Sequence, residues 1–476
     1  MFEINIRIGE RIAMKRIYEQ LLKYRNHGPY PFHMPGHKRK IDDCFAGIHP
    51  YEMDFTEIDG LDDLHEPEEM FREDMDEMKA FYGTKESFFL VNGSTSGIMA
   101  AIASVCDLHD TIIISRNCHK SVYFAIELLG LHPIYIYPTL DEKNGTVINI
   151  DAVELEKIVE KHLEAKAVML VSPTYEGKVM DIPKISTITK KHHMALIVDE
   201  AHGAHFSFGN EFPESAITQG ADLVIQSLHK TMPALTQTAL LHVCTDRILP
   251  QKVQESIDCF ETSSPSYLFA ASMEHAIDYG MHHEREFQQY YHRMKRLREQ
   301  LAAMKHFYIL DTEDVGKVAI STAKSNMTGK QLYDILLSNY GLQMEMAQET
   351  YCLAMTSIYD EEEDLKRIVE ALLEIDQMAE KKKAEKIKGW TQEESLVYIP
   401  YEAKRKKQKS VALEESLGKI SGEYLYLYPP GIPLLVPGER INEKSLQKIQ
   451  EYKEKQFVIK GMEDKKAEKI KVIVEE

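Results

Sequence analysis

Residues 222–234 read DLVIQSLHKTMPA. The apolar run Leu223–Ile225 predicts a strand buried in a sheet, and Ser227, His229 and Lys230 follow it closely. Lysine is rarely left unpaired where a buried strand ends. In apolar surroundings its pKa is lowered, and it can then act as a nucleophile that forms a Schiff base with a carbonyl group. We therefore treat Lys230 as a candidate catalytic residue, with His229 beside it.

Similar apolar runs alternate with helical patterns from about residue 68 to residue 245. The runs are SFFLV (87–91), TIIIS (111–115), HPIYIYP (132–138), AKAVMLVSP (165–173), MALIVDEAH (194–202) and ADLVIQSLHK (221–230). Their nearly continuous apolar character is typical of strands covered on both faces. Strands separated by helices predict an α/β fold with a mostly parallel sheet. Ligands bind at the carboxyl ends of such strands, which is where DEAH and SLHK fall.

A chain of 476 residues is too long for one core. After a helical connection, a second pattern of strands and helices predicts a smaller α+β domain: KVAIST (317–322), TGKQLYDILLSNYG (328–341), TYCLAMTSI (350–358) and a long amphipathic helix from residue 361. We expect four parts: an N-terminal segment (1–67), a large cofactor-binding domain (68–275), the small α+β domain (276–380), and a linker with a C-terminal region (381–476).

Composition excludes several classes of protein. The net charge of −19 argues against nucleic acid or an anionic membrane as a partner. Six scattered cysteines without a C-x-x-C motif indicate neither a zinc ribbon nor a disulfide scaffold, and no metal site is expected. The N-terminus lacks a signal-peptide core, and no run approaches the roughly 18 apolar residues of a membrane span. The sequence therefore predicts a reduced, soluble, cytoplasmic protein.

Two stretches near the C-terminus are interpreted from composition alone. The lysine-rich residues 381–409, which include Trp390, predict an exposed helix end and a linker. The tail YLYLYPPGIPLLVPGERI (424–441) holds four prolines, which argue against a central strand and favour an ordered, docked loop.

Three further features join Lys230 at the predicted strand ends. The turn NGSTSG (92–97) lies between a strand and a helix, where backbone N–H groups bind anions, although an ordinary helix cap explains it equally well. Asp199 ends an apolar run, where a carboxylate needs a partner. It could cap a helix or form a salt bridge, or it could pair with a protonated ring nitrogen. His119 lies at another strand-to-helix junction. A phosphate cradle, a carboxylate for a pyridinium and a strand-end lysine together meet the requirements of pyridoxal 5′-phosphate (PLP).

The sequence resembles the short form of the Orn/Lys/Arg decarboxylase family, which are fold type I PLP enzymes with an aspartate aminotransferase-like large domain. The matching stretches are PFHMPGHK (31–38), TEIDGLDDLHEP (56–67), FFLVNGSTSG (88–97), RNCHKS (116–121), VSPTYEG (171–177), VDEAHGAHF (198–206), QSLHKT (226–231), SSPSY (263–267) and YPPGIPLLVPGE (428–439). The large members carry an extra N-terminal domain, whereas this chain reaches PFHMPGHK after only thirty residues, so the assembly that this domain supports is not carried over from the resemblance.

The resemblance implies a role for each candidate residue. Lys230 would carry PLP as a Schiff base, Asp199 would pair with the pyridine nitrogen, and His119 would stack on the ring opposite Ala201. The residues implied to bind the phosphate or line the site are Ser94, Thr95, Ser96, His202, Ser227 and His229. His202 occupies a position that is often tryptophan in the large members. Lys230 or His229 would return a proton to Cα. Ser263 and Ser264 would reach the partner's phosphate in a homodimer, or a larger homo-oligomer, with shared sites.

The implied reaction converts lysine, arginine or ornithine to cadaverine, agmatine or putrescine and CO2, as in polyamine biosynthesis. Lysine is placed first, arginine second and ornithine third. The carboxylates offered for the cationic side chain are Glu57, Asp59, Asp62, Asp63, Glu66 and Glu439, each of which could equally belong to a solvated loop or a cap. A transaminase would need an arginine for the substrate carboxylate, and Arg367 and Arg440 lie in no recognised motif. Another PLP lyase and a non-catalytic binding protein are the remaining alternatives.

Overall fold

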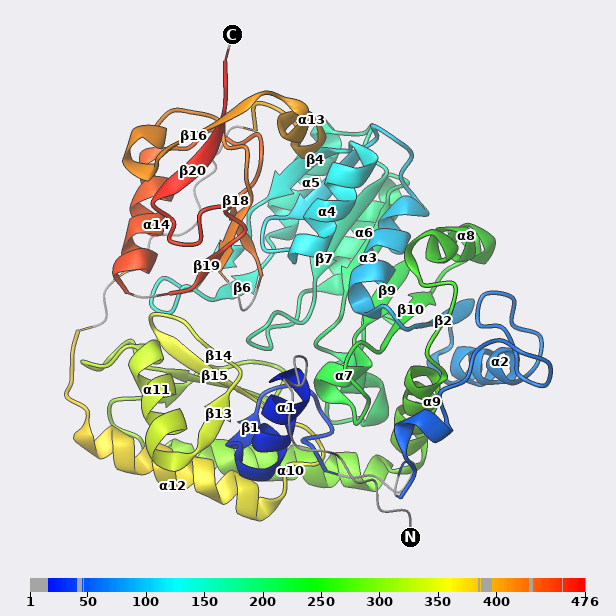
Figure 1. Ribbon diagram of the computed structural model, residues 1–476, viewed down its shortest axis with the longest axis horizontal. Coiled ribbons are helices and arrows are strands. Elements are labelled where there is room, and N and C mark those ends of the chain that lie inside the picture. Colours follow the sequence, from blue (N-terminus) through cyan, green and yellow to red (C-terminus); the bar gives the residue numbers. More distant parts are fainter. Residues whose placement is uncertain are drawn as a thin grey trace, which may run out of the picture.

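The computed structural model describes residues 16–40, 45, 47–383, 386, 396–427, 431–455 and 457–475. Figure 1 shows a large central sheet, a smaller sheet below it and a C-terminal region beside it. The sequence predictions for the N-terminus up to residue 15, for Trp390 and for Pro429 and Pro430 lie outside the described residues.

The central sheet has seven strands in the order β2-β10-β9-β8-β7-β3-β4. Their bounds are β2 Glu86–Leu90, β3 Thr111–Ser115, β4 His132–Ile136, β7 Ala167–Val171, β8 Ala195–Asp199, β9 Leu223–Gln226 and β10 Ala239–Val243. The strands from β9 to β4 pair in parallel, and β10 runs antiparallel to both of its neighbours. The mostly parallel α/β sheet predicted from the sequence is therefore confirmed, with β10 as a strand that the apolar runs did not include.

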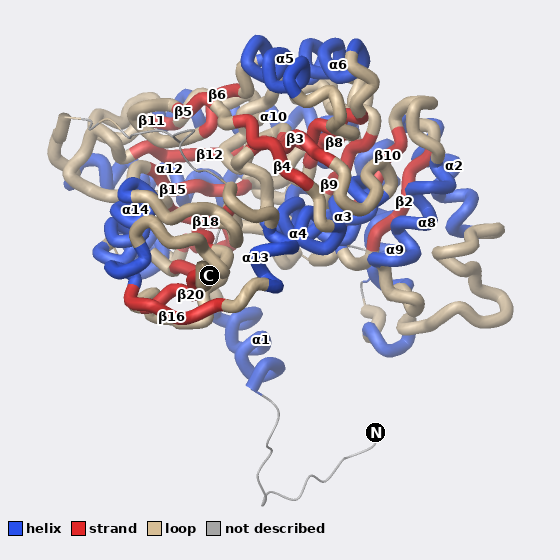
Figure 2. Tube along the Cα trace, turned by 90° about the horizontal axis from the view of Figure 1, so that it is seen from above, coloured by secondary structure: helices blue, strands red, loops and turns tan. Residues whose placement is uncertain are grey.

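Helices cover both faces of this sheet. Those around it are α2 Met70–Tyr82, α3 Gly93–Ala103, α4 Lys120–Leu129, α5 Ala152–Lys161, α6 Ile182–Lys191, α7 Leu228–Thr231, α8 Pro250–Phe260 and α9 Tyr267–His282. Figure 2 shows α5 and α6 on one side of the strands and α3 and α4 on the other. This two-sided cover explains why the strands are apolar along their whole length. None of the described helices is long and apolar enough to cross a membrane.

The smaller sheet has the order β11-β12-β15-β14. Its elements are β11 Tyr308–Ile309, β12 Lys317–Ser321, β14 Met346–Ala347 and β15 Tyr351–Met355, with helices α10 Glu284–Leu301, α11 Gly329–Tyr340 and α12 Glu362–Met378. This confirms the strands and helices expected after residue 276. The largest hydrophobic cluster contains residues of both sheets, whereas most of the C-terminal region has a cluster of its own. The predicted domain limits stay predictions.

The N-terminal segment docks on the small domain, where it forms a separate two-stranded sheet. After α1 (Arg16–His27), strand β1 (Tyr30–Phe32) pairs in parallel with β13 (Leu342–Met344). The buried Lys38 then donates hydrogen bonds from Nζ to the carbonyl oxygens of Pro31, His33 and Met355. The segment PFHMPGHK is thereby fixed at the boundary between the two sheets.

The C-terminal region contains strands where the sequence predicted a loop. Its elements are α13 Pro400–Arg405, β16 Gln408–Ala412, η4 Leu413–Ser416 (a 3-10 helix), β17 Leu425–Leu427, β18 Pro433–Leu435, α14 Glu443–Glu454, β19 Ile459–Lys460 and β20 Lys469–Ile473. Elsewhere in the chain, the remaining short elements are β5 Thr139–Leu140, β6 Val147–Asn149 and the 3-10 helices η2 Pro50–Glu52 and η3 Ala204–Phe208. Strand β17 lies in the middle of the sheet β18-β17-β19, so the argument against a central strand was wrong. Pro433 lies on the edge strand β18, where a missing N–H is tolerated.

A buried ion pair joins the C-terminal region to the central sheet. Arg116 and Glu439 are both fully buried, with Arg116 Nη2 3.3 Å from Glu439 Oε1. Arg116 Nη1 also donates to the carbonyl oxygen of Pro433 at 2.6 Å, and the Val436 N–H donates to Glu439 at 2.7 Å. Glu439 was a candidate for binding the substrate; its carboxylate instead holds the chain together.

We expect Glu439→Ala to lower the free energy of unfolding by about 3–5 kcal/mol, because it leaves the Arg116 charge buried without its carboxylate. Denaturant unfolding of the variant measures this loss. Asp334→Ala is the control, since it removes a pair with Lys330 that is largely exposed and contributes no more than about 0.5 kcal/mol. Equal losses in the two variants would contradict the assignment.

Candidate active site

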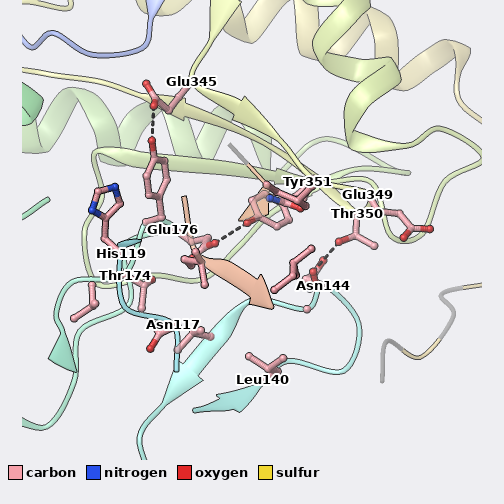
Figure 3. A pocket seen from close by; sticks show the side chains of 18 of the residues that line it. Asn117, His119, Leu140, Asn144, Thr174, Glu176, Glu345, Glu349, Thr350 and Tyr351 are labelled. Carbon is pink, nitrogen blue, oxygen red and sulfur yellow. Dashed lines mark hydrogen bonds between the residues drawn. The ribbon is translucent and has the colours of Figure 1, made fainter. Parts of the chain in front are cut away.

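A cavity of about 1180 Å³ lies at the carboxyl ends of the parallel strands. Figure 3 shows part of its wall, with His119 and Thr174 from the large sheet and Glu345 and Tyr351 from the small one. The N-terminal segment contributes Met34 to the same cavity. The C-terminal region adds Leu434 and Lys455, so four separate parts of the chain enclose one space.

Lys230 lies on the short helix α7, directly after β9. Its Nζ donates a hydrogen bond to Nε2 of the buried His202 at 3.1 Å. Withdrawal from water lowers the pKa of the Lys230 amine, while the carboxylates of Asp199 and Glu345 act in the opposite direction. The lowered pKa favours the uncharged amine, which is the nucleophilic form.

Asp199 is the last residue of β8 and is buried. Its Oδ1 accepts a hydrogen bond from the Ala201 N–H at 3.1 Å. Burial raises the pKa of the Asp199 carboxyl, and the nearby Lys230 partly opposes this. Among the described residues, no lysine, arginine or histidine forms an ion pair with Asp199. A cationic ring nitrogen in the cavity would supply the missing partner.

Two histidines flank the lysine in their neutral forms. His119 caps α4: its Nδ1 accepts from the Ser121 N–H at 3.3 Å. Burial and the neighbouring Lys230 and Lys120 lower the pKa of His119 to about 3. His229 donates from Nδ1 to the carbonyl oxygen of Thr238 at 3.0 Å, and burial lowers its pKa to about 4. Neither ring adds a positive charge beside Lys230 at neutral pH.

The NGSTSG turn forms the N-terminus of α3, and Ser94 and Thr95 line the cavity. Ser227 donates from its hydroxyl to that of Ser94 at 2.8 Å. Gly93 has a φ of +75°, and a Cβ there would meet the Gln237 carbonyl oxygen at 3.4 Å, so the turn requires glycine.

Ser96, in contrast, points away from the cavity. Its hydroxyl donates to the Gly93 carbonyl oxygen at 2.7 Å and to the carboxylate of Glu261, which also accepts the Val91 N–H. The sequence placed Ser96 with the phosphate-binding residues; here it stabilises the turn from behind.

Several predicted residues lie outside the cavity of their own chain. Ser263 and Ser264 are exposed and do not line it. None of the acidic residues of TEIDGLDDLHEP lines it either. Asp62 instead caps α2 by accepting from the N–H groups of Glu69 and Phe71. Sequence alone could not distinguish a cap from a ligand because both use a carboxylate after a turn.

Two cavity residues were missed by the sequence analysis. Tyr175 donates from its hydroxyl to Glu345 Oε1 at 2.5 Å, and the Met34 N–H donates to Glu345 Oε2 at 3.0 Å. The Tyr175 ring also lies against the His202 ring, with centroids 4.4 Å apart. Tyr175 falls within the matching stretch VSPTYEG, but Glu345 lies between two short strands and carried no signal beyond a charge among apolar residues.

The residues of the cavity fit PLP. Ser94, Thr95 and the N-terminal N–H groups of α3 are donors for a phosphate. The buried Asp199 lacks a cation, and Lys230 presents an amine of lowered pKa in the same cavity. His119 and Ala201 both line this space. The set therefore provides partners for the phosphate, the ring nitrogen and the aldehyde of PLP.

Comparison with known proteins gives a consistent result. Residues 16–351 match the Orn/Lys/Arg decarboxylase major domain, and residues 391–457 match the Orn/Lys/Arg decarboxylase C-terminal domain. The chain is 33% identical to the uncharacterized protein YaaO of Bacillus subtilis, over 97% of this chain and 98% of that one. It is 30% identical to an arginine decarboxylase of Bacillus anthracis, over 96% and 97% of the two chains.

Among solved structures, the chain is similar to the constitutive lysine decarboxylase of Escherichia coli. The TM-score is 0.76 at 18% sequence identity, and the match covers 97% of this chain and 82% of that one. At this identity the likeness concerns the fold, and it extends across the central sheet, the small sheet and the C-terminal region.

Proposed function

Because this chain belongs to the Orn/Lys/Arg decarboxylase family, and is thereby a PLP-dependent amino-acid decarboxylase of fold type I, we propose that it decarboxylates a basic amino acid through Lys230. The observation that carries the proposal is the convergence of Lys230, Asp199 and His119 on one cavity at the strand ends. When bound, PLP supplies an electron sink that lets the carboxylate of an amino acid leave as CO2.

The chain's own residues have distinct tasks in this proposal. Lys230 attaches the cofactor through Nζ, and its lowered pKa supplies the free amine that this requires. Asp199 keeps a proton on the ring nitrogen, because a buried carboxylate favours a cationic partner. His119 and Ala201 bound the ring, while Ser94 and Thr95 hold the phosphate.

In this proposal the proton that replaces the lost carboxylate comes from Lys230, because His229 is neutral and its one ring N–H donates to the Thr238 carbonyl oxygen. His202 assists Lys230, since its Nε2 accepts the hydrogen bond from Nζ and can hold the lysine in position. The low pKa values of His119 and His229 keep these rings uncharged, so they do not repel a protonated Lys230.

We place arginine first among the substrates. The relative from Bacillus anthracis, matched along nearly the full chain, is an arginine decarboxylase, and one from Bacillus subtilis with the same name is also 30% identical. This replaces the order suggested by the sequence, which put lysine before arginine and ornithine. The corresponding products are agmatine, cadaverine and putrescine, in keeping with a place in polyamine biosynthesis. The cytoplasmic location stays a prediction.

A transaminase is less well supported by the cavity. Such an enzyme holds the substrate carboxylate with an arginine, and none of the described residues that line the cavity is an arginine. Arg367 lies over the ring of Tyr30, and Arg440 donates to the carbonyl oxygen of Gly418. Both guanidinium groups are therefore occupied elsewhere.

We also propose that the active unit is a homodimer with shared sites. Ser263 and Ser264 are exposed on a loop between α8 and α9, outside the cavity of their own chain. In this proposal they reach the phosphate held by the partner chain. Exposed hydroxyls with no role in their own site are free for such a contact.

The substrate assignment is tested by CO2 release from arginine, lysine and ornithine under identical conditions. We expect the highest kcat/KM with arginine, and measurable release with at least one other basic amino acid. Formation of keto acid without CO2 would indicate a transaminase instead.

Replacement of Lys230 by alanine is expected to abolish both covalent attachment of PLP and CO2 release. The measurement is borohydride reduction of the holoenzyme, followed by peptide mapping, with the visible absorbance as a second readout. Lys143→Ala, which changes another lysine of the cavity wall, serves as the control and should retain both properties. A reduced label on any lysine other than Lys230 would refute the assignment.

Shared sites are tested by mixing two inactive proteins. One carries Lys230→Ala, and the other carries Ser263→Ala with Ser264→Ala. A hybrid dimer then contains one site with both sets of residues intact, so activity should rise as subunits exchange. Confirmed exchange without recovery, or an active monomer in light scattering, would exclude the shared arrangement.

A further inference from the structure

Lys317 is a fully buried lysine whose amine reaches from the small sheet to a turn of the large one. It is the first residue of β12, and its Nζ donates a hydrogen bond to the carbonyl oxygen of His202 at 3.2 Å. Its ion-pair partner is the equally buried Asp314, at 3.1 Å. Burial acts to raise the pKa of the Asp314 carboxyl, but the charge of Lys317 and the contact with His205 hold this pKa below its usual range. The carboxylate is therefore charged at neutral pH.

The turn that carries Lys317 is already held by another cation. Arg298 on α10 donates to the carbonyl oxygens of Leu310, Val315 and Lys317, at 3.1, 3.3 and 2.8 Å. These bonds fix the turn from the side of α10 without using the Lys317 amine. The bond from that amine to His202 therefore joins two parts of the chain, in addition to whatever it adds to the turn.

The position of the His202 ring depends on its backbone. Its Nε2 contacts Lys230 Nζ at 3.1 Å, whereas its Nδ1 is buried and forms no hydrogen bond within the described part of the chain. The Tyr175 ring packs against it, and Gly177 of the same turn lies directly on Lys317: a Cβ at Gly177 would meet the Lys317 side chain at 3.0 Å. The stem of Lys317 thus supports the turn of one ring, and its amine holds the backbone of the other.

The charge of Lys317 also acts on the amine of Lys230. Six charged or titratable groups face this amine from β8 and the turn after it, from α4, from α7 and from the small domain: Asp199, His202, His119, His229, Glu345 and Lys317. Burial lowers the pKa of the Lys230 amine, the two carboxylates oppose this, and Lys317 lowers it further. Burial also lowers the pKa values of the three histidines, so Lys317 is the cation of this group at neutral pH.

On the basis of the proposed function, we propose that Lys317 is a positioning residue of this site: it holds His202 beside Lys230, and its positive charge favours the uncharged form of the lysine amine. Lys317 does not line the cavity, so it acts through the His202 backbone and through its charge rather than by touching a ligand. Asp314 offsets the cost of burying this charge. The small domain thereby contributes to the state of an amine that belongs to the central sheet.

The test removes both charges together in the variant Lys317→Met with Asp314→Asn, because removing one would leave the other buried alone. The full chain is loaded with PLP over a range of pH, and the rate of covalent attachment to Lys230 is followed by the visible absorbance. Without the nearby cation, the Lys230 amine keeps its proton to a higher pH. We expect the pH midpoint of the rate to rise by about 0.5–1 unit, which slows attachment about 3- to 10-fold below the midpoint.

The matched control is Arg247→Met with Asp222→Asn, which removes a pair at 2.7 Å whose two residues do not line the cavity. It should lower the melting temperature and leave the midpoint unchanged. Lys317→Gln with Asp314→Asn removes the same two charges and should show the same rise, so it provides a second variant if the first does not fold. An unchanged midpoint in a folded variant, or an equal rise in the control, would overturn the role of Lys317.

Failure of the proposed function gives a different result. No CO2 release from any basic amino acid by the unchanged holoenzyme would refute that function, while the midpoint of PLP attachment still tests Lys317 directly. Attachment of PLP to a lysine other than Lys230 would overturn both proposals. CO2 release from a basic amino acid, together with a midpoint that does not move when the Lys317 charge is removed, would overturn only the second.

Discussion

Lys230 is partly withdrawn from water where β9 ends, and its amine contacts a neutral histidine rather than a carboxylate. Two other lysines of this chain have partners for the charge on their amines. Lys38 donates to three carbonyl oxygens, and Lys317 pairs with Asp314 at 3.1 Å while donating to the carbonyl oxygen of His202. Both are buried and do not line the cavity. Of these three lysines, Lys230 is the one that faces the cavity and lacks such partners, which is the condition a nucleophilic amine requires.

The rest of the fold maintains that condition. Parallel strands covered on both faces bring Asp199, His119 and Lys230 to the same sheet edge, although they are far apart in the sequence. Lys317 extends the arrangement to the small domain, because its bond to the His202 carbonyl oxygen holds the residue that contacts Lys230. The same Asp314 that pairs with Lys317 also lies 3.3 Å from His205, so three charged or polar groups from two regions stabilise one turn.

Features determined by local pattern were predictable from the sequence. The run TIIIS coincides with β3, and the lysine, aspartate and histidine at the strand ends all line the cavity. Features determined by long-range contacts were not. Ser96 faces Glu261 rather than the cavity, and Glu439 pairs with Arg116 rather than a ligand. Whether a carboxylate pairs inside the core or faces a cavity depends on partners that are far away in the sequence. Glu345 is the clearest case, because its two donors come from the N-terminal segment and the large sheet.

The groups proposed for the reaction and the Glu345 carboxylate lie on different walls of the cavity. The groups proposed for the chemistry lie at the ends of strands in the central sheet, where moving one residue would disturb the core behind it. Glu345 lies between two short strands of the small domain, and its neighbours Leu342 and Met344 belong to the same hydrophobic cluster as the central sheet. A relative named as an arginine decarboxylase matches nearly the whole chain, and a structural neighbour named as a lysine decarboxylase has a similar fold. The Glu345 carboxylate is held by Tyr175, whose ring contacts the ring of His202, so the two walls of the cavity are connected through packed side chains.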